Sequence, residues 1–271
     1  MSESVFETVA NYCSILKVDF TPAEFALLVD KNEMTDEEIN AVATVFKFLW
    51  EKKSEATIRM LLKTSGLPLK NPRTFESFDF SVIKGKDIDK LKNISSLATI
   101  YAHRNVAFIG PPGTGKTHLA QAYGYECCRR GIKTYFIKMS ELRDKFTAAR
   151  RTGKEALVLA GLVRPSCLII DEVGHCQFDK ENTRLFFDLI DRRYNKDGVF
   201  NIVFTSNKSP SEWRENFEED NSLLCALDRI FDDATVFNIK GDSYRGKKLD
   251  TVALRTEKIK APARVTDYLT E

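Results

Sequence analysis

The first part of the chain has apolar residues at helical spacing, and helix-start signals precede them. Ser4 and Thr35 each have a glutamate three residues later, which is the spacing of a capping box, and Pro22 stands where proline favours a helix start. Gly66 favours the end of the last helix. The pattern predicts a small all-α N-terminal domain over residues 1–70. The apolar residues expected on one face of its last helix are Ile39, Val42, Phe46, Leu49, Trp50, Ile58, Leu61 and Leu62.

Downstream of residue 75, short apolar runs alternate with longer amphipathic stretches. This alternation is typical of an α/β fold in which helices cover both faces of a parallel sheet. We therefore predict three regions, namely the helical domain, an α/β core over residues 71–246 and a basic tail over 247–271. The five predicted strands are residues 106–109, 134–137, 167–171, 199–205 and 235–239.

The composition of the 271-residue chain is that of an ordinary globular protein, with 43% hydrophobic and 30% charged residues. Its apolar runs are shorter than the roughly 20 residues that a membrane helix needs, and its first residues lack the features of a signal peptide. The six cysteines form no C-x-x-C pair, so we expect reduced thiols. These features predict a cytoplasmic protein that does not associate with membranes.

The formal net charge is only +2, but the charge is unevenly distributed. Residues 129–154 carry nine Lys or Arg against two Asp or Glu, and residues 240–264 carry eight against three. Two local basic blocks on a nearly neutral protein favour binding of a polyanion such as nucleic acid. Solvated helix faces are the simpler alternative.

A glycine-rich bend joins the first predicted strand to a helix predicted over residues 117–129. Its sequence, GPPGTGKT, has the G-x4-G-K-T spacing of a phosphate-binding loop. Glycines let successive N–H groups point at a phosphate, Lys116 brings a positive charge to the β/γ-phosphates, and the Thr117 hydroxyl can ligate Mg²⁺. ATP and Mg²⁺ are therefore the predicted cofactors. The residues predicted to contact ATP here are Gly110, Pro111, Pro112, Gly113, Thr114, Gly115, Lys116, Thr117 and His118.

Two adjacent carboxylates follow the apolar strand predicted for residues 167–171. Asp171 is placed to complete the Mg²⁺ shell, together with Thr117. Glu172 can orient and deprotonate the attacking water, so it is the predicted general base. With Lys116 it forms the first half of a predicted catalytic set for ATP hydrolysis.

Two further polar residues complete this predicted catalytic set. Asn207 follows the next strand and can reach between the γ-phosphate and the attacking water, although a simple turn asparagine is an alternative. Arg229 lies on a short predicted helix and is a candidate arginine finger. The alternative for Arg229 is a surface ion pair with Asp228 or Asp232.

Taken in order, these motifs resemble the AAA+ ATPases, and within them the IstB/DnaC group, of which the IstB-like transposition helpers are the nearer match. The segment Phe75-x-x-Phe78-Asp79-Phe80 resembles the one that these proteins place before the ATPase core. The resemblance covers roughly residues 55–247. The supporting segments are residues 110–120, 124–131, 171–174, 190–194, 205–207, 211–213, 227–229 and 241–245.

The resemblance implies several structural features. The strand that precedes Asn207 would separate the Asp171 strand from the Lys116 strand, and there would be little or no C-terminal lid. Protomers would assemble into a ring or spiral in which Arg229 reaches the ATP of a neighbour. Arg245 would lie near the phosphates as a second sensor, with a surface role as the alternative. The sequence departs from the resemblance after the Asp-Glu pair. Members of the family often carry an aromatic residue and a proline there, whereas this chain has His175, Cys176, Gln177 and Phe178.

The resemblance also implies a function. The protein would be an ATPase that oligomerises on duplex DNA and assists an insertion-sequence transposase in target selection and activation. A DnaC-like loader of a replicative helicase is one alternative, and a DNA-coating scaffold that uses ATP only as a structural ligand is another. The candidate DNA contacts are Arg143, Lys145, Arg150, Arg151, Lys154, Lys247 and Lys248.

Overall fold

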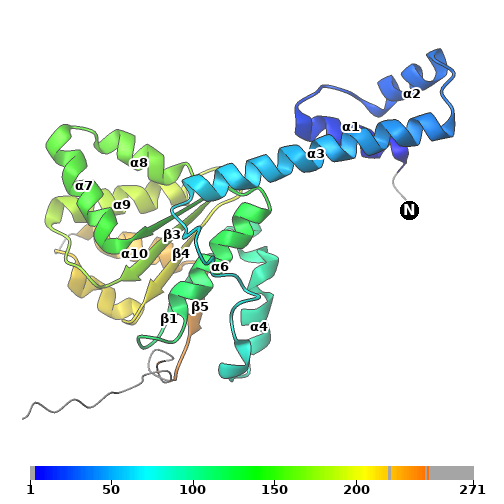
Figure 1. Ribbon diagram of the computed structural model, residues 1–271. Coiled ribbons are helices and arrows are strands. Elements are labelled where there is room, and N and C mark those ends of the chain that lie inside the picture. The colour runs from blue at the N-terminus through cyan, green and yellow to red at the C-terminus, as the bar shows by residue number, and fades with distance from the viewer. Residues whose placement is uncertain (1–3, 219–220, 242, 244–271) are drawn as a thin grey trace, which may run out of the picture.

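The computed structural model describes residues 4–218, 221–241 and 243. A small group of helices at the N-terminus is joined to an α/β body by one long helix (Figure 1). Three residues of the predicted site set, Arg245, Lys247 and Lys248, lie outside the described residues, as does the predicted tail.

The N-terminal helices begin where the sequence predicts. They are α1 (Val5–Leu16), α2 (Pro22–Lys31) and α3 (Asp36–Thr64). Ser4, Thr21 and Thr35 each accept a hydrogen bond from the backbone of a glutamate three residues later, whose side chain bonds back to the cap. All three capping boxes are therefore present. The buried residues of this small core are Val9, Cys13, Phe25 and Ile39.

The long helix α3 differs from its predicted pattern in the middle. Only its ends contribute buried apolar side chains, whereas Leu49 is 45% exposed and Trp50 is half-buried against the ring of Tyr12. Leu61 packs into the α/β body. The helix therefore spans two cores, and its surface between them carries many charges. No helix in the described residues, α3 included, is long and apolar enough to cross a membrane.

The body contains the predicted five-stranded parallel sheet, in the order β2-β3-β4-β1-β5. The strand before Asn207 lies between the Asp171 strand and the strand that leads to Lys116, which confirms that expectation. The largest boundary differences are of two residues: the predicted strand 199–205 starts at Asn201, and the predicted strand 167–171 extends to Val173. The strands are β1 (Asn105–Ile109), β2 (Thr134–Lys138), β3 (Cys167–Val173), β4 (Asn201–Ser206) and β5 (Ala234–Asn238).

Helical segments cover both faces of the sheet (Figure 1). Along β3, Cys167 and Ile169 pack on one side, while Leu168 and Ile170 pack on the other, as the two-residue period of a strand requires. A strand buried on both faces needs a continuous apolar run, which this segment supplies. The helical segments of the body are η1 (Phe80–Val82), α4 (Ile88–Lys92), η2 (Asn93–Ser96), α5 (Ala98–Tyr101), α6 (Lys116–Arg129), α7 (Met139–Thr152), α8 (Glu155–Val163), α9 (Lys180–Tyr194), η3 (Pro210–Asn216) and α10 (Asn221–Phe231).

Candidate functional site: a phosphate pocket at the carboxyl edge of the sheet

A cavity of about 660 Å³ lies where the parallel strands end. The loops after β1, β3 and β4 contribute to it, as does the linker between α3 and the body. Parallel α/β sheets bind ligands at this edge because the strand-to-helix loops meet there. The lining residues are Asn71, Pro72, Arg73, Ser77, Pro112, Gly113, Gly115, Lys116, Thr117, His118, Glu172, His175, Thr205, Ser206 and Asn207.

The glycine-rich loop has the backbone conformation that its sequence predicts. Gly113 and Gly115 have φ values of 81° and 91°, in the region that side chains disfavour. A Cβ on Gly115 would lie 2.7 Å from the ring of Phe78. The helix α6 begins at Lys116, so its unpaired N–H groups lie beside the loop. Lys116 Nζ donates to the carbonyl oxygen of Pro111 at 2.7 Å, which keeps the ammonium group on the loop.

Asp171 and Thr117, the predicted magnesium ligands, are brought together. Thr117 Oγ1 donates to Asp171 Oδ1 at 2.9 Å, and Thr205 Oγ1 donates to the same oxygen. Asp171 is 1% exposed, and burial raises its pKa, while the two hydroxyl hydrogen bonds oppose that shift. A carboxylate beside a hydroxyl fits Mg²⁺, which prefers oxygen ligands.

Glu172 lies in a strained part of the chain. Its φ is 61°, and the register of β3 against β4 shifts between Ile170 and Val173. A non-glycine residue in this conformation is uncommon and has to be held in place by its surroundings. The Glu172 N–H donates to Thr205 Oγ1 at 3.0 Å, which provides part of that support. The irregularity in the pairing of β3 with β4 therefore coincides with the predicted catalytic base.

Lys138, at the end of β2, forms an ion pair with Glu172. Its Nζ lies 3.1 Å from Glu172 Oε2, and this contact raises the pKa of Lys138. Neither Lys138 nor Thr205 was among the site residues predicted from the sequence. Both residues lie at the carboxyl ends of strands that neighbour β3, so a predicted strand order could have pointed to them.

His118 connects the glycine-rich loop to the linker between α3 and the body. Its Nε2 lies 2.9 Å from the carbonyl oxygen of Thr74 and 3.1 Å from Ser77 Oγ, and its ring meets Phe78 edge-on. Burial lowers the pKa of His118, which favours the neutral imidazole. The linker therefore forms one wall of the pocket, and His118 holds it in place.

Arg229 does not lie in this pocket. It borders a separate cavity of about 210 Å³ with Asn105 and Ile202, which stand at the amino-terminal ends of β1 and β4. Its Nη2 lies 3.3 Å from Asp191 Oδ1, so the ion pair that was the alternative for Arg229 does form, but with Asp191 and not with Asp228 or Asp232. Arg229 therefore lies near the amino-terminal ends of the strands, whereas the phosphate pocket lies at their carboxyl ends. It cannot reach the phosphate pocket of its own chain.

The predicted DNA contacts over residues 143–154 lie on α7 and at the start of α8. Arg143 pairs with Asp144 at 2.8 Å, and Arg150 pairs with Asp179 at 2.9 Å. The ammonium group of Lys145 lies 5.8 Å from the centre of the Tyr135 ring. Arg151 and Lys154 are exposed and have no ion pair within the described residues. Of the five, Lys145, Arg151 and Lys154 therefore have no acidic partner within the described residues.

Comparison with known proteins identifies relatives and fold neighbours. The chain is 38% identical over 194 residues to a protein named as an ATP-binding protein of insertion sequence IS5376 from Geobacillus stearothermophilus, covering 72% of this chain and 75% of that one. It is 34% identical over 199 residues to the corresponding protein of insertion sequence IS21 from Pseudomonas aeruginosa, covering 73% of each.

Solved structures share the fold at lower identity. AMPPCP-bound DnaA from Aquifex aeolicus aligns with a TM-score of 0.53 at 19% identity, over 64% of this chain and 52% of that one. The DnaC helicase loader aligns with a TM-score of 0.51 at 18% identity, over 62% of this chain and 97% of that one. These likenesses confirm an AAA+ P-loop fold.

The sequence profile that describes the IstB-like ATP binding proteins matches residues 30–251. The match covers most of the chain, from within α2 past the last strand of the sheet. Together with relatives more than 30% identical over nearly three quarters of its length, it shows that this chain belongs to the family of IstB-like ATP-binding proteins.

Proposed function

We propose that this protein is an ATPase that assembles on duplex DNA and assists an insertion-sequence transposase in selecting and activating its target. The observation that carries the proposal is the convergence of Lys116, Thr117, Glu172 and Asn207 at one pocket of about 660 Å³, with Asp171 hydrogen-bonded to Thr117. A protein that used ATP only as a structural ligand would have no physical need for a positioned base beside the phosphate loop.

In this proposal, the glycine-rich loop and the start of α6 bind the phosphates through backbone N–H groups. Lys116 leaves the carbonyl of Pro111 and binds the β- and γ-phosphates. Thr117 and Asp171 would hold Mg²⁺, which supplies charge neutralisation when bound. Glu172 accepts a proton from the attacking water, and Asn207 orients that water against the γ-phosphate.

The position of Arg229 supports a site that is completed between two protomers. Because it lies at the other edge of the sheet from its own pocket, Arg229 can stabilise transition-state charge only at a neighbour's ATP. The contacts with Asp191 and with the rings of Phe187 and Tyr194 would then be exchanged for phosphate on assembly. Head-to-tail contacts of this kind produce a ring or a spiral.

Basic side chains of the α7–α8 segment would contact the DNA backbone in that assembly. Lys145, Arg151 and Lys154 are the strongest candidates, because Arg143 and Arg150 already have acidic partners. Contacts with phosphate alone give binding that tolerates sequence and weakens with salt. The transposase partner is inferred from the insertion sequences that carry the two relatives.

Fluorescence anisotropy of labelled duplex and single-stranded DNA, with and without ATP and across a salt series, tests the proposal. We expect ATP-dependent duplex binding that weakens steeply with salt, and loss of the ATP effect in Lys116→Ala. Arg151→Ala combined with Lys154→Ala should weaken binding and reduce the salt slope, whereas Arg192→Ala on α9 should not. A preference for single strands, or binding only with a hexameric helicase, would favour the helicase-loader alternative.

A further inference from the structure

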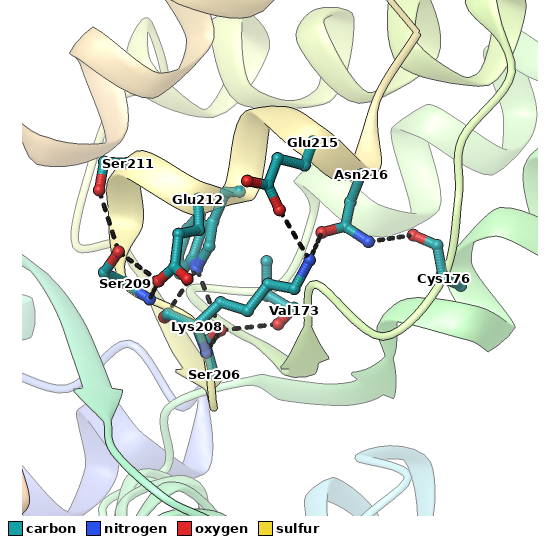
Figure 2. Close-up of polar contacts among 10 residues, drawn as sticks. Val173, Cys176, Ser206, Lys208, Ser209, Ser211, Glu212, Glu215 and Asn216 are labelled. Carbon is teal, nitrogen blue, oxygen red and sulfur yellow. Dashed lines mark hydrogen bonds and ion pairs between the residues drawn. The ribbon is translucent and has the colours of Figure 1, made fainter.

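The loops after β3 and β4 are joined by a buried serine (Figure 2). Ser206 Oγ donates to the carbonyl oxygen of Val173 at 2.7 Å and accepts from the backbone N–H of Lys208 at 3.0 Å. The indole N–H of Trp213 also donates to Ser206 Oγ, at 3.0 Å. Ser206 is 1% exposed, so this connection is shielded from water.

A second set of hydrogen bonds joins the same two loops. Lys208 Nζ donates to Asn216 Oδ1 at 2.9 Å, and Asn216 Nδ2 donates to the carbonyl oxygen of Cys176 at 3.3 Å (Figure 2). The chain is therefore fixed on both sides of His175 and on both sides of Asn207. The fold holds these two residues as a pair.

The pair meets in the phosphate pocket. The Nε2 atom of His175 lies 2.9 Å from Asn207 Nδ2, and both residues line the cavity together with Lys116 and Glu172. The backbone N–H of His175 also donates to the carbonyl oxygen of Glu172 at 3.2 Å, which ties the histidine to the predicted base. An imidazole thus lies against the side chain predicted to orient the attacking water.

The hydrogen-bonding state of Nε2 decides how the Asn207 amide can lie. An imidazole nitrogen without a proton accepts from the amide NH₂ and leaves Oδ1 free, whereas a protonated nitrogen donates to Oδ1 and leaves the NH₂ free. The oxygen can accept a hydrogen bond from the attacking water, and the NH₂ can donate to a phosphate oxygen. Fixing one of these arrangements before ATP binds removes a reorganisation step.

We propose that His175 is a positioning residue that fixes the orientation of the Asn207 side-chain amide in the ATP site. The proposal rests on the ATPase function proposed above and adds a residue to which that function assigns no role. His175 acts through Asn207 and does not itself touch the reacting atoms.

A double-mutant cycle on ATP hydrolysis tests this role. His175→Phe keeps an aromatic ring but removes the hydrogen bond, so kcat should fall by about tenfold, the equivalent of one hydrogen bond, while KM for ATP stays unchanged. His175→Gln, which can still pair with an amide, should recover part of the rate. Gln177→Ala, in the same loop and exposed, is the matched control.

The second half of the cycle measures the effect of His175→Phe on kcat in an Asn207→Ala background. A radioactive phosphate-release assay is used because these enzymes are slow. We expect the histidine substitution to have no further effect there, because the residue it positions is absent. A tenfold loss that persists in that background, or an unchanged kcat in His175→Phe alone, would overturn the proposal. Absence of hydrolysis in the wild type with DNA present would instead reject the ATPase function on which it rests.

The contact between His175 and Asn207 can also be tested without ATP turnover, by NMR of the histidine rings, if the variants are poor enzymes. The chain has three histidines, so ¹⁵N-histidine NMR with His175→Phe assigns the relevant ring signals. Asn207→Ala should shift the Nε2 resonance of His175 and leave that of His118 in place. Identical His175 signals with and without the Asn207 amide would contradict the contact.

Discussion

The ammonium group of Lys138 lies 3.1 Å from Oε2 of Glu172, so the predicted catalytic base forms an ion pair across the end of the sheet. The pair joins the carboxyl ends of β2 and β3, and both side chains are partly exposed. An oxygen bonded to Lys138 is less available to an attacking water. The position of the Glu172 carboxylate therefore depends on the position of Lys138 at the end of β2. The basic helix α7 follows directly after Lys138.

Removing this ion pair should raise the basal rate of ATP hydrolysis. In Lys138→Met, both carboxylate oxygens of Glu172 become available to water, so steady-state phosphate release without DNA should increase severalfold. Lys154→Met, at an exposed position without an ion pair in the described structure, is the control. A rate at or below that of the wild type would mean that Lys138 supports hydrolysis instead of restraining it.

Glu172→Gln should separate binding from hydrolysis. The amide keeps the size of the side chain but cannot accept a proton, so we expect turnover to fall on the order of 10²- to 10³-fold. The affinity for a fluorescent ATP analogue should stay close to that of the wild type, because Lys116 and the glycine-rich loop are unchanged. Unimpaired turnover in this variant would remove Glu172 from the role of base.

The buried carboxylate of Asp171 should give the nucleotide-free protein a characteristic pH dependence. Its pKa is raised, so between its unfolded-state value and its folded-state value the native protein binds more protons than the unfolded chain. Its contribution to the free energy of unfolding is therefore present at low pH and is lost as pH rises through the raised pKa.

Urea unfolding of the wild type and Asp171→Asn across pH 4–8 measures this contribution as a difference. We expect the stability of the wild type relative to the variant to decrease as pH rises. Mg²⁺ with ATP should stabilise the wild type at the upper end of the range and have less effect on the variant. A relative stability that increases with pH would contradict the assignment.

Several parts of this fold and site could be predicted from local sequence. The capping glutamates after Ser4 and Thr35 act within one helical turn, and the apolar run before Asp171 suits a strand buried on both faces. The glycine-rich loop is likewise a local feature, because its φ values follow from residue type. These elements depend little on distant parts of the chain.

Contacts between distant segments could not be predicted in the same way. Lys138 lies 34 positions before Glu172, and Arg229 pairs with Asp191 on α9 instead of with an acidic residue on its own helix. Both contacts depend on strand order and helix packing, which no local spacing encodes. The middle of α3 differed from prediction for a related reason, because no second element covers Leu49 in the described residues.

Arg193 should be the most important charged residue for stability within the described chain. Its guanidinium is 1% exposed and donates to the carbonyl oxygens of Leu162, Val163, Pro165, Ser166 and Asn201. Burial lowers its pKa to about 10, so it stays charged at neutral pH.

Arg193→Met should reduce the free energy of unfolding by about 3 kcal/mol or more, because several buried carbonyls lose their donor. Arg192→Met, at the exposed neighbouring position, should change it by less than about 0.5 kcal/mol. Chemical denaturation of both variants provides the measurement. Equal losses of unfolding free energy in Arg193→Met and Arg192→Met would show that the hydrogen bonds of Arg193 do not stabilise the fold.

In the proposed assembly, the ATP site is completed between two protomers, by Lys116 and Glu172 from one and Arg229 from the next. Mixing Glu172→Gln with Arg229→Ala tests it most directly, because each variant lacks a different half of the site. Each alone should be nearly inactive, and an equal mixture assembled on duplex DNA should regain up to about a quarter of wild-type ATP turnover, as random head-to-tail pairing requires. A mixture no more active than the sum of its components, or an Arg229→Ala protein with wild-type turnover, would contradict the shared site.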